Sequence, residues 1–148
     1  MSKEWATPTW YLFHTIATRL DESYFNSHLI ECKNLIQNIC GNLPCPICQN
    51  HAIYYLKTTN FHRIRTLAQF REYLFIFHNF VNTQLGKKKF TKAEMEKYSR
   101  ANIDKIIILF YHKFKAHYRT GTSFVGWRRR KALGDIANKL LKMRSHMK

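Results

Sequence analysis

The sequence predicts an all-α protein, a bundle of four or five helices followed by a basic amphipathic helix. Apolar residues recur every three or four positions along most of the 148 residues, and glycines and capping residues interrupt the pattern. No series of alternating apolar and polar residues indicates strands. Hydrophobic residues make up 45% of the chain and aromatic residues 15%, which excludes a disordered protein. We expect the bundle in residues 1–114 and a C-terminal extension in residues 115–148.

Six segments carry the helical spacing, and they span residues 9–20, 23–40, 44–57, 66–85, 91–114 and 127–148. The first is expected to begin at Thr7 or Thr9 as its N-cap, with Pro8 in the first turn. The second ends at Gly41, because glycine commonly stops a helix. The third begins at a pair of cysteines in "PCPICQNHA".

The later segments have equally clear limits. The fourth stops at Gly86 and is apolar nearly all the way round between residues 73 and 81, so it must pack on more than one side. Thr91 and Glu94 form a capping-box pattern that opens the fifth. Residues 119–126 break the pattern as a linker. The last helix is expected to place five apolar residues on one face: Leu133, Ile136, Ala137, Leu140 and Leu141.

The formal net charge of +16 is concentrated at the C-terminal end. Residues 115–148 hold ten lysines or arginines and a single acid, Asp135, so they contribute +9. A basic helix of this kind suits nucleic-acid phosphates, an anionic membrane surface or an acidic partner. It equally suits a helix that packs on the bundle with its basic side in solvent, and both arrangements stay open.

Neither a membrane span nor a secretory signal is visible. The N-terminal "MSKEWATPTW" has no basic stretch followed by an apolar one. The longest apolar runs, "YLFIF" and "IIILFY", are far shorter than the roughly 18 to 20 residues that cross a bilayer. We therefore expect an intracellular protein, in which a CxxC pair indicates metal binding or redox chemistry ahead of structural bridging.

Cys45 and Cys48, in "NLPCPICQNH", admit three interpretations: zinc ligands, a redox-active pair, or core cysteines. A structural zinc site needs four ligands, and no second pair at a suitable distance follows. Cys32 and Cys40 lie about 12 Å apart along a helix, too far for a tight four-sulfur site or for a disulfide between them. We expect these two to be buried core residues.

A redox role suits the local sequence better. A cysteine at a helix N-terminus is stabilised as the thiolate, the species that reacts in disulfide exchange. Pro44 and Pro46 help to fix that helix start. A thioredoxin fold is excluded because the chain lacks βαβ units, so the pair needs a different electron acceptor.

Three blocks occur in order over about residues 5–100: "WATPTWYLFH", "LPCPICQNHA" and "FHNFVNTQLGKKKF". Together they resemble the Erv/ALR family of FAD-dependent sulfhydryl oxidases, and most closely the short versions of large nucleocytoplasmic DNA viruses. Ala6 stands where the family usually has glycine. The spacing of the third block puts His78, Val81 and Asn82 on one helix face, which suits a flat aromatic ligand.

The resemblance implies an FAD-binding four-helix bundle with a fifth helix, and a redox-active disulfide between Cys45 and Cys48. A substrate thiolate would attack Cys45, and Cys48 would pass electrons to FAD and then to molecular oxygen, giving hydrogen peroxide. No metal is expected. The implied cofactor contacts are Trp5, Trp10, His14, His51, His78, Asn79, Val81, Asn82, Leu85, Lys87, Lys88 and Phe90.

The resemblance also implies partners and a location. The electron donor would be a dithiol protein substrate or a thioredoxin-like carrier protein, since no cysteine follows Cys48 in this sequence. A homodimer is expected, and by analogy the protein works in host cytoplasm or in virions. The rival interpretation is a zinc-containing helical module that binds nucleic acid through the CxxC pair and the basic tail.

Overall fold

The computed structural model describes residues 3–118 and 124–148. The described residues are almost entirely helical, with no β-strand among them beyond one isolated bridge between Leu20 and Met147. The elements are α1 (Ala6–Arg19), α2 (Glu22–Ser27), α3 (Leu29–Cys40), α4 (Pro46–Thr58), η1 (Phe61–Arg63), α5 (Leu67–Gln84), η2 (Ala93–Arg100), α6 (Ile103–Tyr118) and α7 (Phe124–Arg144). The predicted all-α class is confirmed.

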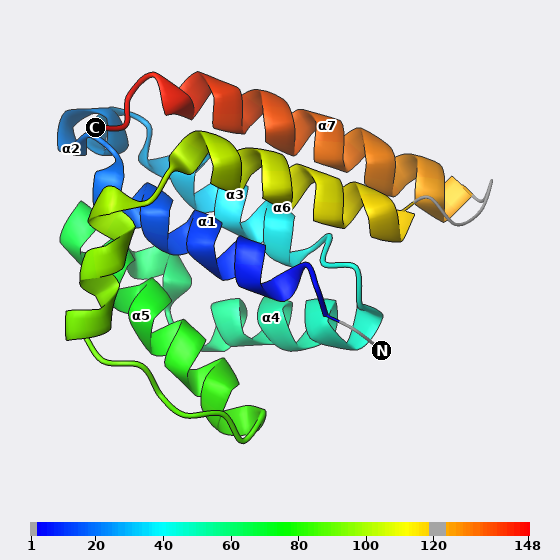
Figure 1. Ribbon diagram of the computed structural model, residues 1–148, viewed down its shortest axis with the longest axis horizontal. Helices are drawn as coiled ribbons and strands as arrows, with labels where there is room; N and C mark the ends of the chain where they lie inside the picture. Colours follow the sequence, from blue (N-terminus) through cyan, green and yellow to red (C-terminus); the bar gives the residue numbers. More distant parts are fainter. Residues whose placement is uncertain (1–2, 119–123) are drawn as a thin grey trace.

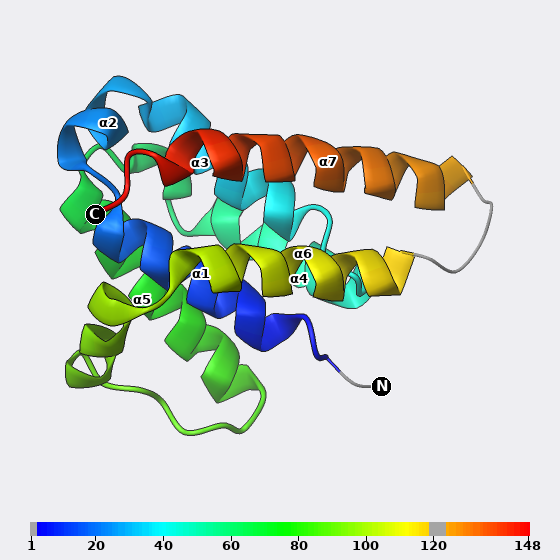
Figure 2. The same cartoon turned by 45° about the horizontal axis from the view of Figure 1, so that its top comes forward.

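Helix α1 lies at the centre of the molecule. It contacts α5 and η2 on one side and α6 on the other, while α4 packs against α3 (Figure 1). Helices α6 and α7 lie side by side and run antiparallel, and α7 also covers α3 (Figures 1 and 2). One apolar core joins these elements, and its largest fully buried side chains include Phe13, Phe25, Phe61, Phe70, Phe110 and Phe114.

The predicted ends of the third and fourth helical segments are confirmed. Cys45 is the N-cap of α4, with Pro46 in the first helical position. Thr66 caps α5 in a capping box with Gln69. After the C-cap of α5, Gly86 has φ of +69°, a left-handed conformation that glycine adopts at little cost.

The expected threonine cap of the first helix is wrong. Helix α1 begins at Ala6, its N-cap is Trp5, and no side chain caps it. Thr9 already lies inside the helix, where its hydroxyl donates to the carbonyl of Trp5 at 2.6 Å. The earlier start places Trp5 in the core, where it is 6% exposed and packs edge-on against Phe114.

The single helix predicted over 23–40 is also wrong, because the chain breaks at His28 into α2 and α3. His28 leaves the helical region with φ −127° and ψ 35°. Its ring stacks on Tyr24 at 4.1 Å, and the bend lets Phe25 meet Phe70 with ring centroids 5.2 Å apart. Packing against α5 therefore overrides a continuous helical pattern.

The fifth predicted helix is two elements. Thr91 and Glu94 do form a capping box, but it opens the 3-10 helix η2, which ends at Arg100. Helix α6 starts afresh at Ile103, after two intervening residues, and the Asn102 side chain accepts the backbone N–H of Lys105 at 3.1 Å.

Helix α7 starts at Phe124, three residues before its predicted start at Trp127. The rest of the predicted linker, residues 119–123, lies outside the described residues. Of the two arrangements left open for the C-terminal segment, the structure has the packed one. Its core-facing side chains are Leu133, Ile136, Leu140 and Met143, whereas Leu141 is 65% exposed and does not belong to that face.

The C-terminal end is joined to the first turn of α6 and to the end of α1. Arg144 makes a two-pronged ion pair with Asp104, at 2.6 and 3.1 Å. The backbone N–H of Lys148 donates to the carbonyl of Arg19 at 2.9 Å, next to the isolated bridge. Within the described residues, no helix has both the length and the apolar character needed to cross a membrane.

Candidate functional site

A cavity of about 950 Å³ opens between α1, α4 and α5, with the end of α3 and part of η2 completing its wall. This volume lies at the upper end of the roughly 300–1,000 Å³ of small-molecule and cofactor sites. Both cysteines of the CxxC pair line it, together with aromatic side chains of three helices. The cavity is therefore the candidate functional site.

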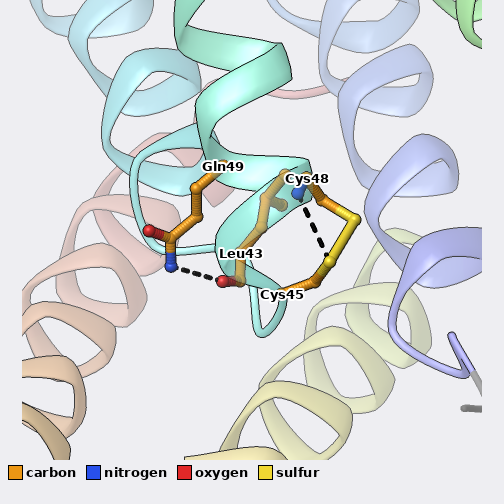
Figure 3. The surroundings of a disulfide bond; sticks show 4 residues. All are labelled: Leu43, Cys45, Cys48 and Gln49. Carbon is orange, nitrogen blue, oxygen red and sulfur yellow. Dashed lines mark hydrogen bonds between the residues drawn. A yellow bond between two sulfur atoms is a disulfide. The ribbon is translucent and has the colours of Figure 1, made fainter.

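The cysteine pair sits where the loop after α3 turns into α4 (Figure 3). Cys45 and Cys48 form a disulfide, with Cα atoms 5.2 Å apart. The backbone N–H of Cys48 points at Cys45 Sγ, with nitrogen and sulfur 3.3 Å apart. The side-chain amide of Gln49 donates to the carbonyl of Leu43 at 2.6 Å and fixes the loop that enters the pair (Figure 3).

This placement favours thiolate chemistry. The sulfurs lie at the N-terminal end of α4, where the helix dipole and free backbone N–H groups stabilise negative charge. Cys45 is 9% exposed and Cys48 is half-buried, and both face the cavity. Exposure does not distinguish a substrate-facing cysteine from a cofactor-facing one, so that distinction depends on the resemblance.

A cluster of rings forms the wall opposite α4. Trp10 of α1 stacks on His78 of α5, with ring centroids 4.2 Å apart and planes inclined by 6°. His14 lies behind them, and its Nε2 is 2.9 Å from His78 Nδ1. The ring of Phe90 packs on His78 at 4.5 Å. These contacts hold His78 firmly in the cavity wall.

Both histidines are neutral at ordinary pH. Burial lowers the pKa of His14 to about 3, helped by the neighbouring His78 and by Lys97. Burial likewise lowers the pKa of His78 to about 4, with smaller contributions from Lys97 and Lys87. The cavity wall is therefore an uncharged aromatic surface with lysines close to it.

Most of the predicted cofactor contacts come together in the cavity. The predicted contacts that line the cavity are Trp5, Trp10, His51, His78, Val81, Asn82, Leu85 and Lys87. They converge because the α1 block and the α5 block pack against each other, with the cysteine block beside them. The three sequence blocks therefore meet in one place.

Four of the predicted contacts do not line the cavity. His14 and Phe90 support His78 from behind. The side-chain amide of Asn79 makes two hydrogen bonds with the backbone of Phe90. It donates to the carbonyl of Phe90 and accepts the N–H of Phe90, both at 3.0 Å. Lys88 is exposed in the segment between α5 and η2. Asn79 thus anchors that segment.

The structure adds wall residues that the sequence did not single out. Tyr55 of α4 stacks on Phe77 of α5 with centroids 4.5 Å apart, and both line the cavity. Tyr55 follows Cys48 by seven residues, so the helical period could have identified it. Lys97 and Tyr98 come from η2, and no sequence signal marked the 3-10 geometry that turns them toward the cavity.

Cys32 and Cys40 are free thiols, each 1% exposed, as expected for core residues. Burial raises the pKa of each to about 12, so neither is a thiolate near neutral pH. Cys40 reaches the cavity wall at the end of α3. Nowhere in 3–118 or 124–148 do three His, Cys, Asp or Glu side chains gather in a way that could hold a metal ion.

The residues fit a planar aromatic ligand that carries negative charge. Trp10, Tyr55 and Phe77 offer flat apolar surface, and Lys3, Lys87 and Lys97 supply cationic groups in the same wall. A flavin dinucleotide has this combination of flat rings and a diphosphate, and its reactive ring could lie beside a disulfide here.

Comparison with known proteins identifies relatives of this chain. The family model described as the Erv1 / Alr family matches residues 7–100. A "FAD-linked sulfhydryl oxidase" of African swine fever virus is 30% identical over 103 residues, covering 70% of this chain and 86% of that protein.

A second isolate of the same virus has a protein of that name that is 31% identical over 90 residues, covering 61% of this chain and 75% of its own length. The "Putative FAD-linked sulfhydryl oxidase 096R" of Invertebrate iridescent virus 3 is 31% identical over 86 residues, covering 57% of this chain and 58% of that protein. No solved structure matches.

Proposed function

The chain belongs to the Erv1/Alr family and is an FAD-linked sulfhydryl oxidase, and we propose that it forms disulfide bonds in partner proteins through Cys45 and Cys48. One observation carries the proposal. The disulfide at the start of α4 and the Trp10–His78 stack line the same cavity, so thiol chemistry and cofactor share one space.

Residues of three helices would hold the cofactor. Trp10, Tyr55 and His78 offer ring surfaces to its flat parts, and Lys87 and Lys97 offer positive charge to its diphosphate. When bound, FAD supplies the two-electron acceptor that links the cysteine pair to molecular oxygen, with hydrogen peroxide as the product. The chain's own residues perform the thiol exchange.

In the first exchange a substrate thiolate attacks Cys45 Sγ. A substrate–Cys45 disulfide forms, the Cys45–Cys48 bond breaks, and Cys48 leaves as a thiolate at the N-terminus of α4, which stabilises it. The second substrate thiolate then attacks the substrate sulfur of this mixed disulfide. Cys45 leaves as a thiolate, and the N–H of Cys48, 3.3 Å from Cys45 Sγ, favours its departure. The substrate has lost two electrons and two protons, and the cysteine pair holds the electrons.

The proposal extends to partners and location. The donor is a dithiol protein or a thioredoxin-like carrier, and the viral relatives support a place in host cytoplasm or virions. The basic side of α7 is available for nucleic acid or an acidic partner. A homodimer would need an apolar surface other than α1 and α3, which α6 and α7 cover, and exposed Tyr54, Ile76 and Phe80 offer one.

Two measurements on the purified protein test the assignment. We expect the visible absorption of an oxidised flavin, and oxygen consumption with matching hydrogen peroxide when dithiothreitol is added. A colourless protein that contains zinc and consumes no oxygen would instead support the rival nucleic-acid-binding module.

A trapping experiment tests the separate roles of the two cysteines. In Cys48→Ala, Cys45 is a free thiol, so it should attack the disulfide of a partner protein supplied already oxidised and stay joined to it as a mixed disulfide, while the partner's other sulfur leaves as a thiol. The product is visible on non-reducing gels and identifiable by mass spectrometry. Cys45→Ala is the matched control and should trap little. The opposite pattern would reverse the assignment of the two cysteines.

A further inference from the structure

One buried histidine pair stands behind the cavity wall, and only one of its members reaches the cavity. His78 lines the cavity, whereas His14 is completely buried. His14 Nε2 and His78 Nδ1 are 2.9 Å apart, a hydrogen-bond distance. The other ring nitrogen of His14, Nδ1, is buried and has no hydrogen-bond partner.

Only one proton can lie between the two rings. A contact with a proton on both facing nitrogens, or on neither, has no hydrogen bond. Since both rings are neutral, as their lowered pKa values indicate, each carries one proton. Two arrangements therefore remain, and they differ in which histidine donates.

In the first arrangement His14 donates through Nε2–H, and His14 Nδ1 is a bare lone pair. His78 then accepts at Nδ1 and keeps its own proton on Nε2. In the second arrangement His78 donates through Nδ1–H, so the proton of His14 must sit on Nδ1, a buried position without an acceptor. Orphaned buried N–H groups are rare in proteins, which disfavours the second.

Intrinsic chemistry points the same way, because the Nε2–H form is the favoured tautomer of an isolated neutral histidine. The first arrangement gives both rings this form, and the second gives both the other form. The ring of His78 is held in this orientation, with Nδ1 toward His14, because Trp10 stacks on it at 4.2 Å and Phe90 packs on it at 4.5 Å.

We propose that His14 is a positioning residue that fixes His78 as the Nε2–H tautomer, so that His78 offers a hydrogen-bond donor to an acceptor atom of the bound FAD. With Nδ1 engaged by His14, Nε2 is the nitrogen of His78 left for a ligand. The role toward FAD rests on the proposed function, while the tautomer is a property of the protein alone.

The tautomer is measurable by nitrogen NMR of the ¹⁵N-histidine-labelled apoprotein at neutral pH. We expect His78 to show a protonated Nε2 and a bare Nδ1, and the Nε2–H signal to shift when FAD is added. A proton found on Nδ1 of His78 would overturn the inference whether or not the protein oxidises thiols.

Two variants separate positioning from packing. His14→Phe keeps an aromatic ring but removes the donor, so His78 should become a mixture of tautomers and FAD should bind about threefold to tenfold more weakly, the value of one hydrogen bond. His14→Gln can place an amide N–H near the position of Nε2 and should restore much of both. Unchanged tautomer and FAD affinity in His14→Phe would also overturn the inference.

The failure of the proposed function has a different signature. A protein with the expected tautomer and an FAD-dependent shift of His78, but without oxidase activity, would contradict the thiol chemistry and support the histidine pair. FAD affinity is measured by quenching of flavin fluorescence, so this readout does not depend on turnover.

Discussion

At the scale of single residues, the site depends on side chains that never touch the cavity. His14 supports His78, and Asn79 holds the backbone of Phe90, which in turn packs on His78. The motif in the sequence groups all these residues as ligand contacts, because spacing alone does not distinguish a residue that faces a ligand from one that holds it in place. The packing of α1 on α5 shows which of these residues line the cavity and which lie behind its wall.

Asn79→Ala should therefore act on stability. Removing the side chain breaks two hydrogen bonds to Phe90 and leaves two backbone groups unpaired, which should lower the free energy of unfolding by about 1–3 kcal/mol. Urea denaturation measures the loss. Asn138→Ala, at an exposed position of α7, is the control and should change stability by less than about 0.5 kcal/mol. Equal effects of the two substitutions would contradict the anchoring role.

The neutral histidine pair predicts a pH dependence of stability. The pKa is lowered to about 3 in His14 and to about 4 in His78, whereas an unfolded histidine titrates near about 6.5. Below that value the two histidines bind protons in the unfolded chain but stay neutral in the folded chain. The free energy of unfolding should thus be unaffected by the pair above about pH 6.5 and fall below it by about 1.4 kcal/mol per pH unit for each proton.

Urea denaturation at pH 7 and pH 5 checks this dependence. His14→Phe should reduce the slope by about one proton, and Asn138→Ala, which removes no titrating group, should leave it unchanged. An identical slope in wild type and His14→Phe would show that His14 takes up its proton in the folded state.

At the scale of helices, the sequence predicts where helices exist better than where they break. The apolar period, the helix start at the cysteine pair and the stop at Gly86 are local signals, and each is found in the structure. The break at His28 has no local signal, whereas the break at Ala101 is followed by Asn102, whose side chain caps α6. Tertiary contacts decide them: Phe25 packs on Phe70, and Arg19 donates to the carbonyl of Ala101 at 2.5 Å.

A contact from α6 reaches the loop that precedes the disulfide. The hydroxyl of Tyr118, which is 2% exposed, donates to the carbonyl of Asn42. Tyr118→Phe should loosen this loop and expose Cys45, so that small thiols reduce the disulfide several-fold faster while FAD affinity stays the same. Tyr111→Phe removes another hydroxyl from α6, one without a hydrogen bond among the described residues, and should have no effect on that rate. Equal rates in wild type and Tyr118→Phe would exclude this link.

At the scale of the whole molecule, α7 belongs to the same core as the bundle. The family model ends at residue 100, but Phe110, Phe114 and Leu140 are each at most 1% exposed within the shared core. The basic composition of this segment indicates only its solvent side, and its amphipathic spacing is compatible with either arrangement. The choice between them depends on apolar surface of α1 and α3 that the sequence alone does not reveal.

Substitutions of two neighbouring leucines of α7 test whether α7 and the bundle unfold together. Leu140→Ala removes a side chain that is 1% exposed and should cost about 2–5 kcal/mol, with the whole protein still unfolding in a single transition. Leu141→Ala, at a side chain 65% exposed, should cost less than about 0.5 kcal/mol. Two separate unfolding transitions in calorimetry, with only one sensitive to Leu140→Ala, would show that α7 is an independent unit.

The central claim is that electrons travel from a substrate dithiol through the Cys45–Cys48 pair to FAD. Its most direct test is anaerobic stopped-flow absorbance of the flavin after mixing with a dithiol. The flavin of the wild type should bleach at a rate consistent with turnover. Cys48→Ala should bind FAD with an unchanged visible spectrum and show no bleaching on that time scale. Bleaching of Cys48→Ala at the wild-type rate would contradict the claim, because electrons would then reach the flavin without the cysteine pair.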